Sequence, residues 1–286
     1  MNRILYFCLV CLTLAGCADS KKGNDKNLPT VTVTIEPLRY FTEQIAGDKF
    51  NVVTMVPKGS SPETYEPTAQ QMVDLANSEL YIKVGNLGFE RTWGKRLQAN
   101  AQHLIVIDTS EGIHREVSGH RGETDPHTWL SPANALVIAQ NIYKALALVD
   151  KKDSLYFKAR LDRLSRSVMD IDIDIDKKLK SLPTRSFLIY HPALTYFAQD
   201  YKLTQIAIEE DGREPSAASL ADVIDRARRD KVGIMLLQKE YNNRNTRIVT
   251  DATKADIREI DPLNYRWDME MEHIAKTLAG QATTRK

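Results

Sequence analysis

Four side chains that could bind a metal ion each lie in a loop that follows a short run of β-branched and apolar residues: Glu63, His127, His191 and Asp261. Two neutral imidazoles and two carboxylates make a nitrogen and oxygen ligand set that suits Zn²⁺, Mn²⁺ or Fe²⁺. The set is too rich in nitrogen for Ca²⁺ or Mg²⁺, which prefer oxygen ligands. We therefore predict a site for one divalent transition-metal ion, with Zn²⁺ favoured and Mn²⁺ or Fe²⁺ as alternatives.

Each of these four residues also has a purely structural interpretation. Glu63 could be a solvated loop carboxylate, with Glu66 or a water molecule as the fourth ligand. The two histidines could be buried in the core and hydrogen-bonded there. Asp261 precedes Pro262 and could cap the turn into the last helix, which is a common role for aspartate.

Two further polar groups are expected to lie on solvated surface. His114 and His120 belong to the segment 112–124, where charged residues surround them. Residues 209–211 form an acidic run, and such a run is usually a solvated face, although it could guide cations inward.

Short β-branched runs alternate with helix-like segments on both sides of the chain's middle. This alternation predicts an α/β fold of two βα lobes with mainly parallel sheets covered by helices. In open α/β sheets, ligands bind outside the carboxyl ends of the strands, so we expect the four candidate ligands at a metal cleft between the lobes. The predicted strands are residues 31–35, 51–56, 80–84, 104–108, 186–190, 205–208, 233–238 and 256–260.

The middle of the chain, residues 132–182, has no strand signal and is rich in alanine, leucine and charged residues. From residue 150 onward its apolar residues recur at helical spacing, which predicts one long rigid helix joining the lobes. Residues 170–176 alternate aspartate and isoleucine as a strand could, but the flanking helical phase favours helix. The predicted domains are an N-terminal lobe at 29–149, a connecting helix at 150–182 and a C-terminal lobe at 183–282.

The first residues are typical of a secretory signal. Arg3 is followed by an apolar run, and Leu14-Ala15-Gly16-Cys17 resembles a bacterial lipobox, in which the cysteine is lipidated and becomes the new N-terminus. We predict a signal peptide at 1–17, a lipid anchor on Cys17 and a flexible tether at 18–28. An ordinary signal peptide ending near Ala18 is the alternative.

The amino-acid composition argues against some classes of function. Lys and Arg total 39 and Asp and Glu total 38, so a net charge of +1 gives no reason to expect a nucleic-acid partner. No stretch after the signal is long and apolar enough to span a bilayer. We expect a lipid-anchored protein of the bacterial cell envelope, on the periplasmic or extracytoplasmic side.

The loops that carry the candidate ligands resemble those of the solute-binding proteins of zinc and manganese ABC importers, the family of the zinc-uptake and treponemal metal-binding proteins. The match covers nearly the whole mature chain, with five segments in the right order and spacing. These are residues 59–67, Asp125-Pro126-His127-Thr128-Trp129-Leu130-Ser131-Pro132, His191-Pro192-Ala193-Leu194-Thr195-Tyr196-Phe197-Ala198, Glu214-Pro215-Ser216 and Asp261-Pro262-Leu263.

The resemblance implies two α/β lobes bridged by a long helix, metal held between them, and a partner permease and ATPase. Three of the family's ligand positions map to His127, His191 and Asp261. At the first position the family pattern is Ser-Pro-His-Thr-Tyr-Glu, where this chain has Glu63 in place of the histidine. This exchange adds a carboxylate and leaves the identity of the metal open.

We therefore predict high-affinity capture of a divalent transition-metal ion and its delivery to an ABC importer, by a monomer that is not an enzyme. A metal-stabilised adhesin of the same fold is one alternative. A metallohydrolase is another, but it would need an open coordination position with bound water, and no His-Glu-x-x-His pattern is present.

Overall fold

The computed structural model describes residues 28–101, 103–118, 123–209 and 213–280. Each half of the chain forms a four-stranded parallel sheet. The first sheet has the order β2-β1-β3-β4 and the second the order β10-β9-β7-β8. Their strands are β1 Thr30–Val33, β2 Asn51–Thr54, β3 Leu80–Lys83, β4 Ile105–Asp108, β7 Ser186–Ile189, β8 Thr204–Ala207, β9 Ile234–Gln238 and β10 Asp256–Ile260.

The two sheets share one connectivity. In each, the first strand of the chain pairs with the second on one side and with the third on the other, so strand order reverses at β1 and at β7. The first strands are largely buried: every residue of β7 is buried, as expected for a parallel strand covered on both faces. A small antiparallel hairpin of β5 Val117–Ser118 and β6 Glu123–Thr124 follows the first sheet.

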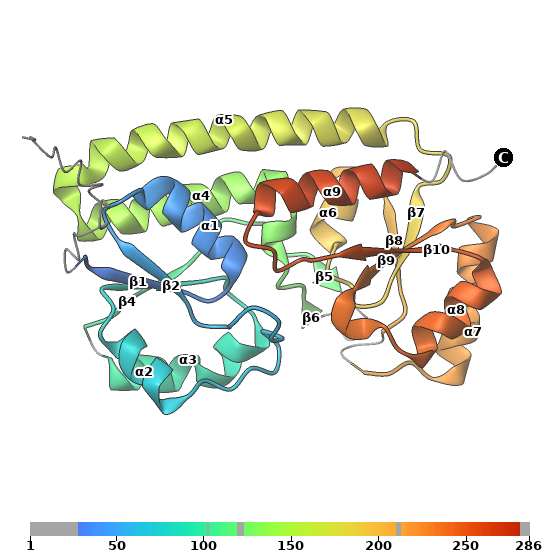
Figure 1. Ribbon diagram of the computed structural model, residues 1–286, viewed down its shortest axis with the longest axis horizontal. Coiled ribbons are helices and arrows are strands. Elements are labelled where there is room, and N and C mark those ends of the chain that lie inside the picture. The colour runs from blue at the N-terminus through green and yellow to red at the C-terminus, as the bar shows by residue number, and fades with distance from the viewer. Residues whose placement is uncertain (1–27, 102, 119–122, 210–212, 281–286) are drawn as a thin grey trace, which may run out of the picture.

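Helices cover both faces of each sheet (Figure 1). One layer is shared: α5 runs above both sheets, with α1, α4 and α9 beneath it. The opposite faces have separate covers, α2 and α3 on the first sheet and α7 and α8 on the second. The helices are α1 Glu36–Ala46, α2 Ala69–Ala76, α3 Gly88–Asn100, α4 Pro132–Val149, α5 Ser154–Leu179, α6 Thr195–Asp200, α7 Ala217–Arg229, α8 Arg244–Thr253 and α9 Trp267–Ala279, with short 3-10 turns η1 Thr128–Leu130, η2 Lys151–Asp153 and η3 Lys239–Tyr241.

The apolar core lies between the sheets and the helices that cover them. One continuous apolar cluster lies under the shared helices and includes Val33 of the first sheet and Phe187 of the second. Smaller clusters lie under α2 and α3 and under α7 and α8, and they include Leu75 and Met235 respectively. The two lobes therefore rest against one common helical layer.

Helix α5 is 26 residues long and extends about 39 Å, which spans both lobes in Figure 1. Its buried residues recur every three or four positions, so a single stripe faces the core: Phe157, Leu161, Leu164, Val168, Ile171, Ile175 and Leu179. The helical prediction for residues 170–176 is confirmed, because Ile171 and Ile175 are buried while Ile173 is half exposed.

The predicted α/β fold is confirmed. All eight predicted strands are present, with ends that differ by two residues at most. The predicted domain boundaries stay predictions, and Cys17 with residues 18–27 lies outside the described part of the chain. Within that described part, no helix is both long enough and apolar enough to cross a membrane.

Candidate metal centre

His127 lies in the segment that leads from the β5–β6 hairpin into α4. The Asp125 carboxylate holds it in two ways: Oδ1 accepts from the backbone N–H of His127 at 2.8 Å and from its Nδ1 at 2.7 Å. The η1 turn follows at once, and Ser131 then caps α4 by accepting from the backbone N–H of Asn134. Both Asp125 and His127 are buried, so the ring is fixed in position and orientation.

Burial and charge act in opposite directions on this pair. Burial alone would raise the pKa of Asp125, but the adjacent His127 outweighs burial and lowers it. Burial opposes protonation of His127, yet the Asp125 carboxylate, with Glu63 and Glu209 adding to it, raises the pKa of that imidazole. Asp125 is therefore a carboxylate at neutral pH and accepts the Nδ1 proton.

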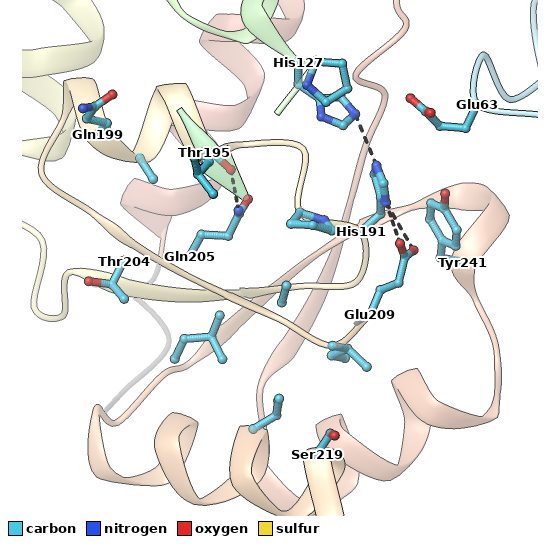
Figure 2. Close-up of a pocket in the computed structure, with 18 of the residues that line it drawn as sticks. Glu63, His127, His191, Thr195, Gln199, Thr204, Gln205, Glu209, Ser219 and Tyr241 are labelled. Carbon is cyan, nitrogen blue, oxygen red and sulfur yellow. Dashed lines mark hydrogen bonds and ion pairs between the residues drawn. The ribbon is translucent and has the colours of Figure 1, made fainter. Parts of the chain in front are cut away.

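His191 follows β7 at the carboxyl end of the second sheet. Its Nδ1 lies 3.1 Å from Oε1 and 3.2 Å from Oε2 of Glu209, whose side chain is only 7% exposed. The ring stacks on Tyr241 with a centroid distance of 5.6 Å, and Gln238 donates to the His191 carbonyl. His191 thus has its own carboxylate partner, as His127 does (Figure 2).

The placement of Glu209 corrects the expectation that residues 209–211 begin a solvated face; residues 210–212 lie outside the described residues. One signal in the sequence pattern could have identified this glutamate. Glu209 comes two residues after the end of β8, the second strand of its sheet in chain order, and Glu63 comes after β2, the second strand of the other. The two glutamates therefore follow corresponding strands.

The two imidazoles meet at their other nitrogens. Nε2 of His127 lies 3.2 Å from Nε2 of His191, and the ring planes are inclined by 70°. Because a carboxylate only accepts hydrogen bonds, each Nδ1 donates to its carboxylate, and a ring that carries a single proton presents a lone pair at Nε2. Two lone pairs at this separation repel unless a cation or a proton lies between them.

Glu63 reaches the same cavity, which has a volume of about 1010 Å³. Its Oε2 accepts from the backbone N–H of Gly88 at 3.0 Å and lies 3.8 Å from Nη2 of Arg91. Its Oε1 is buried without a hydrogen-bond partner among the described residues, and Figure 2 shows the carboxyl group directed toward the two imidazoles. A buried carboxylate oxygen with an unused acceptor suits a cation.

Asp261 is placed differently. Among the described residues, it is not one of those that line this cavity. Its Oδ1 accepts from the backbone N–H of Leu263 at 3.2 Å, which is the turn-capping geometry considered as the alternative. Its segment is nevertheless tied to the His127 loop, because Trp129 Nε1 donates to the Pro262 carbonyl and Trp267 Nε1 to the Trp129 carbonyl.

The structure thus joins two of the four predicted ligands and brings a third to the same cavity. In the described ranges, no three side chains of histidine, cysteine, aspartate or glutamate are grouped so that they could hold an ion. The complete four-ligand set therefore stays a prediction. The other described histidines lie elsewhere: His103 is exposed in a turn before β4, His114 is 90% exposed beside Glu116, and His273 donates to the Glu259 carbonyl. His120 lies outside the described residues.

A cavity where two α/β lobes of equal connectivity each present an imidazole defines a binding protein with its ligand site between the lobes. Comparison with known families agrees, since the model of the family described as zinc-uptake complex component A, periplasmic (ZnuA) matches residues 31–280. The chain belongs to this family.

Two individual relatives are less than 30% identical to this chain. The chain is 28% identical over 281 residues to the zinc-binding lipoprotein AdcA of Streptococcus pneumoniae strain R6, a match covering 91% of this chain and 54% of AdcA. It therefore spans about half the length of that relative. The manganese ABC transporter substrate-binding lipoprotein PsaA of Streptococcus pneumoniae serotype 4 is 25% identical over 274 residues, covering 90% of this chain and 87% of PsaA.

Solved structures agree on the fold. A crystal structure of ZnuA superposes with a TM-score of 0.84 at 32% identity, covering 89% of this chain and 99% of that one. The predicted resemblance to zinc and manganese solute-binding proteins is therefore confirmed.

Proposed function

We propose that this protein captures one divalent transition-metal ion, with Zn²⁺ favoured over Mn²⁺ and Fe²⁺, and delivers it to an ABC importer. The observation that carries the proposal is the pair of facing Nε2 atoms 3.2 Å apart, each on a ring whose Nδ1 is committed to a carboxylate. Two nitrogens bound to one tetrahedral Zn²⁺ at 2.0–2.1 Å are themselves about 3.3 Å apart. The observed separation is therefore one that a single ion between the rings would need.

Glu63 and Asp261 complete the proposed ligand set. Oε1 of Glu63 is the best placed, because it is buried in the cavity with its acceptor unused among the described residues. Asp261 would have to release the Leu263 N–H and turn toward the imidazoles. Its link through Pro262 to Trp129 keeps it beside the His127 loop, which shortens that movement.

The setting of the site follows from the relatives. PsaA is by name a substrate-binding lipoprotein of a manganese ABC transporter, so we assign this chain a partner permease and ATPase. We also propose a lipid anchor on Cys17, a location on the extracytoplasmic side of the membrane and a monomeric state. The protein binds its ion and passes it on without chemical conversion, so it is not an enzyme.

Isothermal titration of the purified protein lacking residues 1–17 with zinc, manganese and iron(II) tests the proposal. We expect one ion per chain, with zinc bound most tightly. His127→Ala and His191→Ala each remove a nitrogen ligand and should weaken zinc binding by at least about a hundredfold. His273→Ala, at an exposed histidine, is the matched control and should bind as the parent does. If the two site variants bind zinc as tightly as the parent, the assignment of His127 and His191 as ligands is wrong.

Transport itself is tested in cells. Deleting the gene should lower uptake of radioactive metal, and the parent gene should restore it where His127→Ala and His191→Ala do not. Normal uptake without the gene would favour an adhesin role, in which the metal only stabilises the fold.

A further inference from the structure

The two carboxylate oxygens of Glu63 have unequal surroundings. Oε2 accepts from the Gly88 N–H and lies near Arg91, whereas Oε1 is buried with no partner in the described part of the chain. One oxygen is therefore held by the protein and the other is available to a ligand.

The start of α3 holds Oε2 in place. Gly88 is the first residue of this helix, so its N–H has no partner within the helix and points at the carboxylate. The next residue, Phe89, donates to the Pro62 carbonyl at 2.9 Å, which ties the Glu63 loop to the helix. A Cβ at Gly88 would lie 2.3 Å from the Glu63 carbonyl oxygen and 2.7 Å from Oε2, so the close approach needs glycine.

Arg91 adds a cation on the same side. Its Nη2 lies 3.8 Å from Oε2 of Glu63, and its Nη1 donates to the Asn86 carbonyl at 2.6 Å, which keeps the guanidinium near the loop. Arg91 also lines the cavity that contains both imidazoles. A positive side chain at a cation site repels the ion. The presence of Arg91 here is therefore best explained by its contact with Glu63.

We infer that Gly88 and Arg91 restrict Glu63 to binding the metal through Oε1 alone, and that this restriction selects four-coordinate Zn²⁺ over Mn²⁺. The inference rests on the proposed function. Zn²⁺ is satisfied by four ligands, whereas Mn²⁺ takes more oxygen ligands and gains more from a carboxylate that binds through both atoms. For Mn²⁺ to use both atoms, Oε2 must leave the Gly88 N–H and the guanidinium of Arg91.

Competition titrations of Zn²⁺ and Mn²⁺ with the purified parent and Arg91→Gln test this selection. We expect Mn²⁺ affinity to rise by about fivefold and Zn²⁺ affinity by clearly less, so the preference for zinc falls. The control is Arg258→Gln: Arg258 is 57% exposed, against 51% for Arg91, and lies 3.6 Å from Asp256 outside the cavity. It loses the same charge and should leave both affinities unchanged.

Equal gains in affinity for both ions in Arg91→Gln would mean that Arg91 only repels cations, and would overturn the inference. If the parent binds zinc and the ratio of zinc to manganese affinity is the same in Arg91→Gln, the inference is likewise overturned. A parent that binds neither ion refutes the proposed function as well.

The number of bound oxygens can be measured directly. In a crystal structure of the zinc-loaded protein, Oε1 of Glu63 should lie about 2.0–2.2 Å from the ion, with Oε2 still accepting from the Gly88 N–H. A Glu63 that binds zinc through both oxygens would overturn the inference even if the titrations agreed with it.

Discussion

Each imidazole of the site is paired with a buried carboxylate, and this pairing prepares the ring before any ion arrives. Asp125 holds Nδ1 of His127 at 2.7 Å, and Glu209 holds Nδ1 of His191 at 3.1 Å. A carboxylate behind a ligating histidine fixes its tautomer and makes the free nitrogen more basic. In its neutral form each ring therefore already carries its proton on Nδ1, away from the ion.

Replacing Glu209 should weaken metal binding without removing a ligand. We expect Glu209→Gln to lower zinc affinity by about tenfold, because the ring loses its charged acceptor and becomes a poorer donor to the metal. Isothermal titration measures the effect. Asp222→Asn is the control, since Asp222 is an exposed carboxylate on the same cavity and its loss changes the charge alone. An equal loss in both variants would show that general attraction, and not the pairing with His191, explains the effect.

The raised pKa of His127 predicts opposite effects of pH on the metal-free and metal-loaded protein. Burial opposes protonation, but the Asp125 carboxylate outweighs it, so the pKa of His127 lies above its ordinary 6.5. In the metal-free protein the Asp125–His127 pair stabilises the fold fully at pH values below the pKa that His127 has in the unfolded chain. This stabilisation is lost as pH rises through the pKa of His127 in the folded protein. Zinc needs the neutral ring, so stabilisation by zinc grows over the same interval.

Thermal unfolding with and without zinc between about pH 6 and 8 measures both slopes. Asp125→Asn removes the main cause of the raised pKa, so the slope of the metal-free protein should become smaller in that variant. Parallel slopes for the metal-free and zinc-loaded parent would contradict the prediction.

At the scale of elements, the start of α3 positions Glu63. Gly88→Ala should weaken zinc binding and lower the free energy of unfolding, because the new Cβ would lie 2.3 Å from the Glu63 carbonyl oxygen. Gly94→Ala lies in the same helix, and its new methyl group would meet no atom within 4 Å, so it should instead stabilise the protein by about 0.5–1 kcal/mol. Denaturant unfolding and zinc titration of both variants compare the two. If Gly88→Ala behaves like Gly94→Ala, the close approach does not constrain Glu63.

At the scale of the whole molecule, the shared helical layer joins the lobes into one folding unit. The main apolar cluster contains residues of both sheets, and α5 contributes Phe157 and Ile175 to it. Phe50 of the first lobe packs near Phe157, with ring centroids 6.0 Å apart. Loss of packing at either end of α5 should therefore destabilise both lobes together.

Phe157→Ala and Ile175→Ala test this coupling. Each removes a fully buried side chain and should lower the free energy of unfolding, by about 3–5 and 2–5 kcal/mol respectively. Both should shift one cooperative transition, seen at the same denaturant concentration by circular dichroism and by tryptophan fluorescence. Two separated transitions, with one variant affecting only the first, would show that the lobes unfold independently.

Local patterns in the sequence determined the elements. The strands follow from short β-branched runs, and α5 follows from apolar residues spaced at three and four positions, since both periods are properties of neighbouring residues. The rule that ligands gather at the carboxyl ends of parallel strands identified both histidines, because it depends on strand order in general terms and not on exact contacts. It describes His191 directly, whereas His127 follows the β5–β6 hairpin instead.

Tertiary structure decided which polar groups meet. Glu209 lies 18 residues from the histidine it supports, and Gly88 lies 25 residues from Glu63. Asp261 follows a strand as predicted, yet its carboxylate accepts from Leu263, and it is absent from the described lining of the cavity. Such pairings depend on how strands and helices are placed across a sheet, and no period in the sequence encodes that placement.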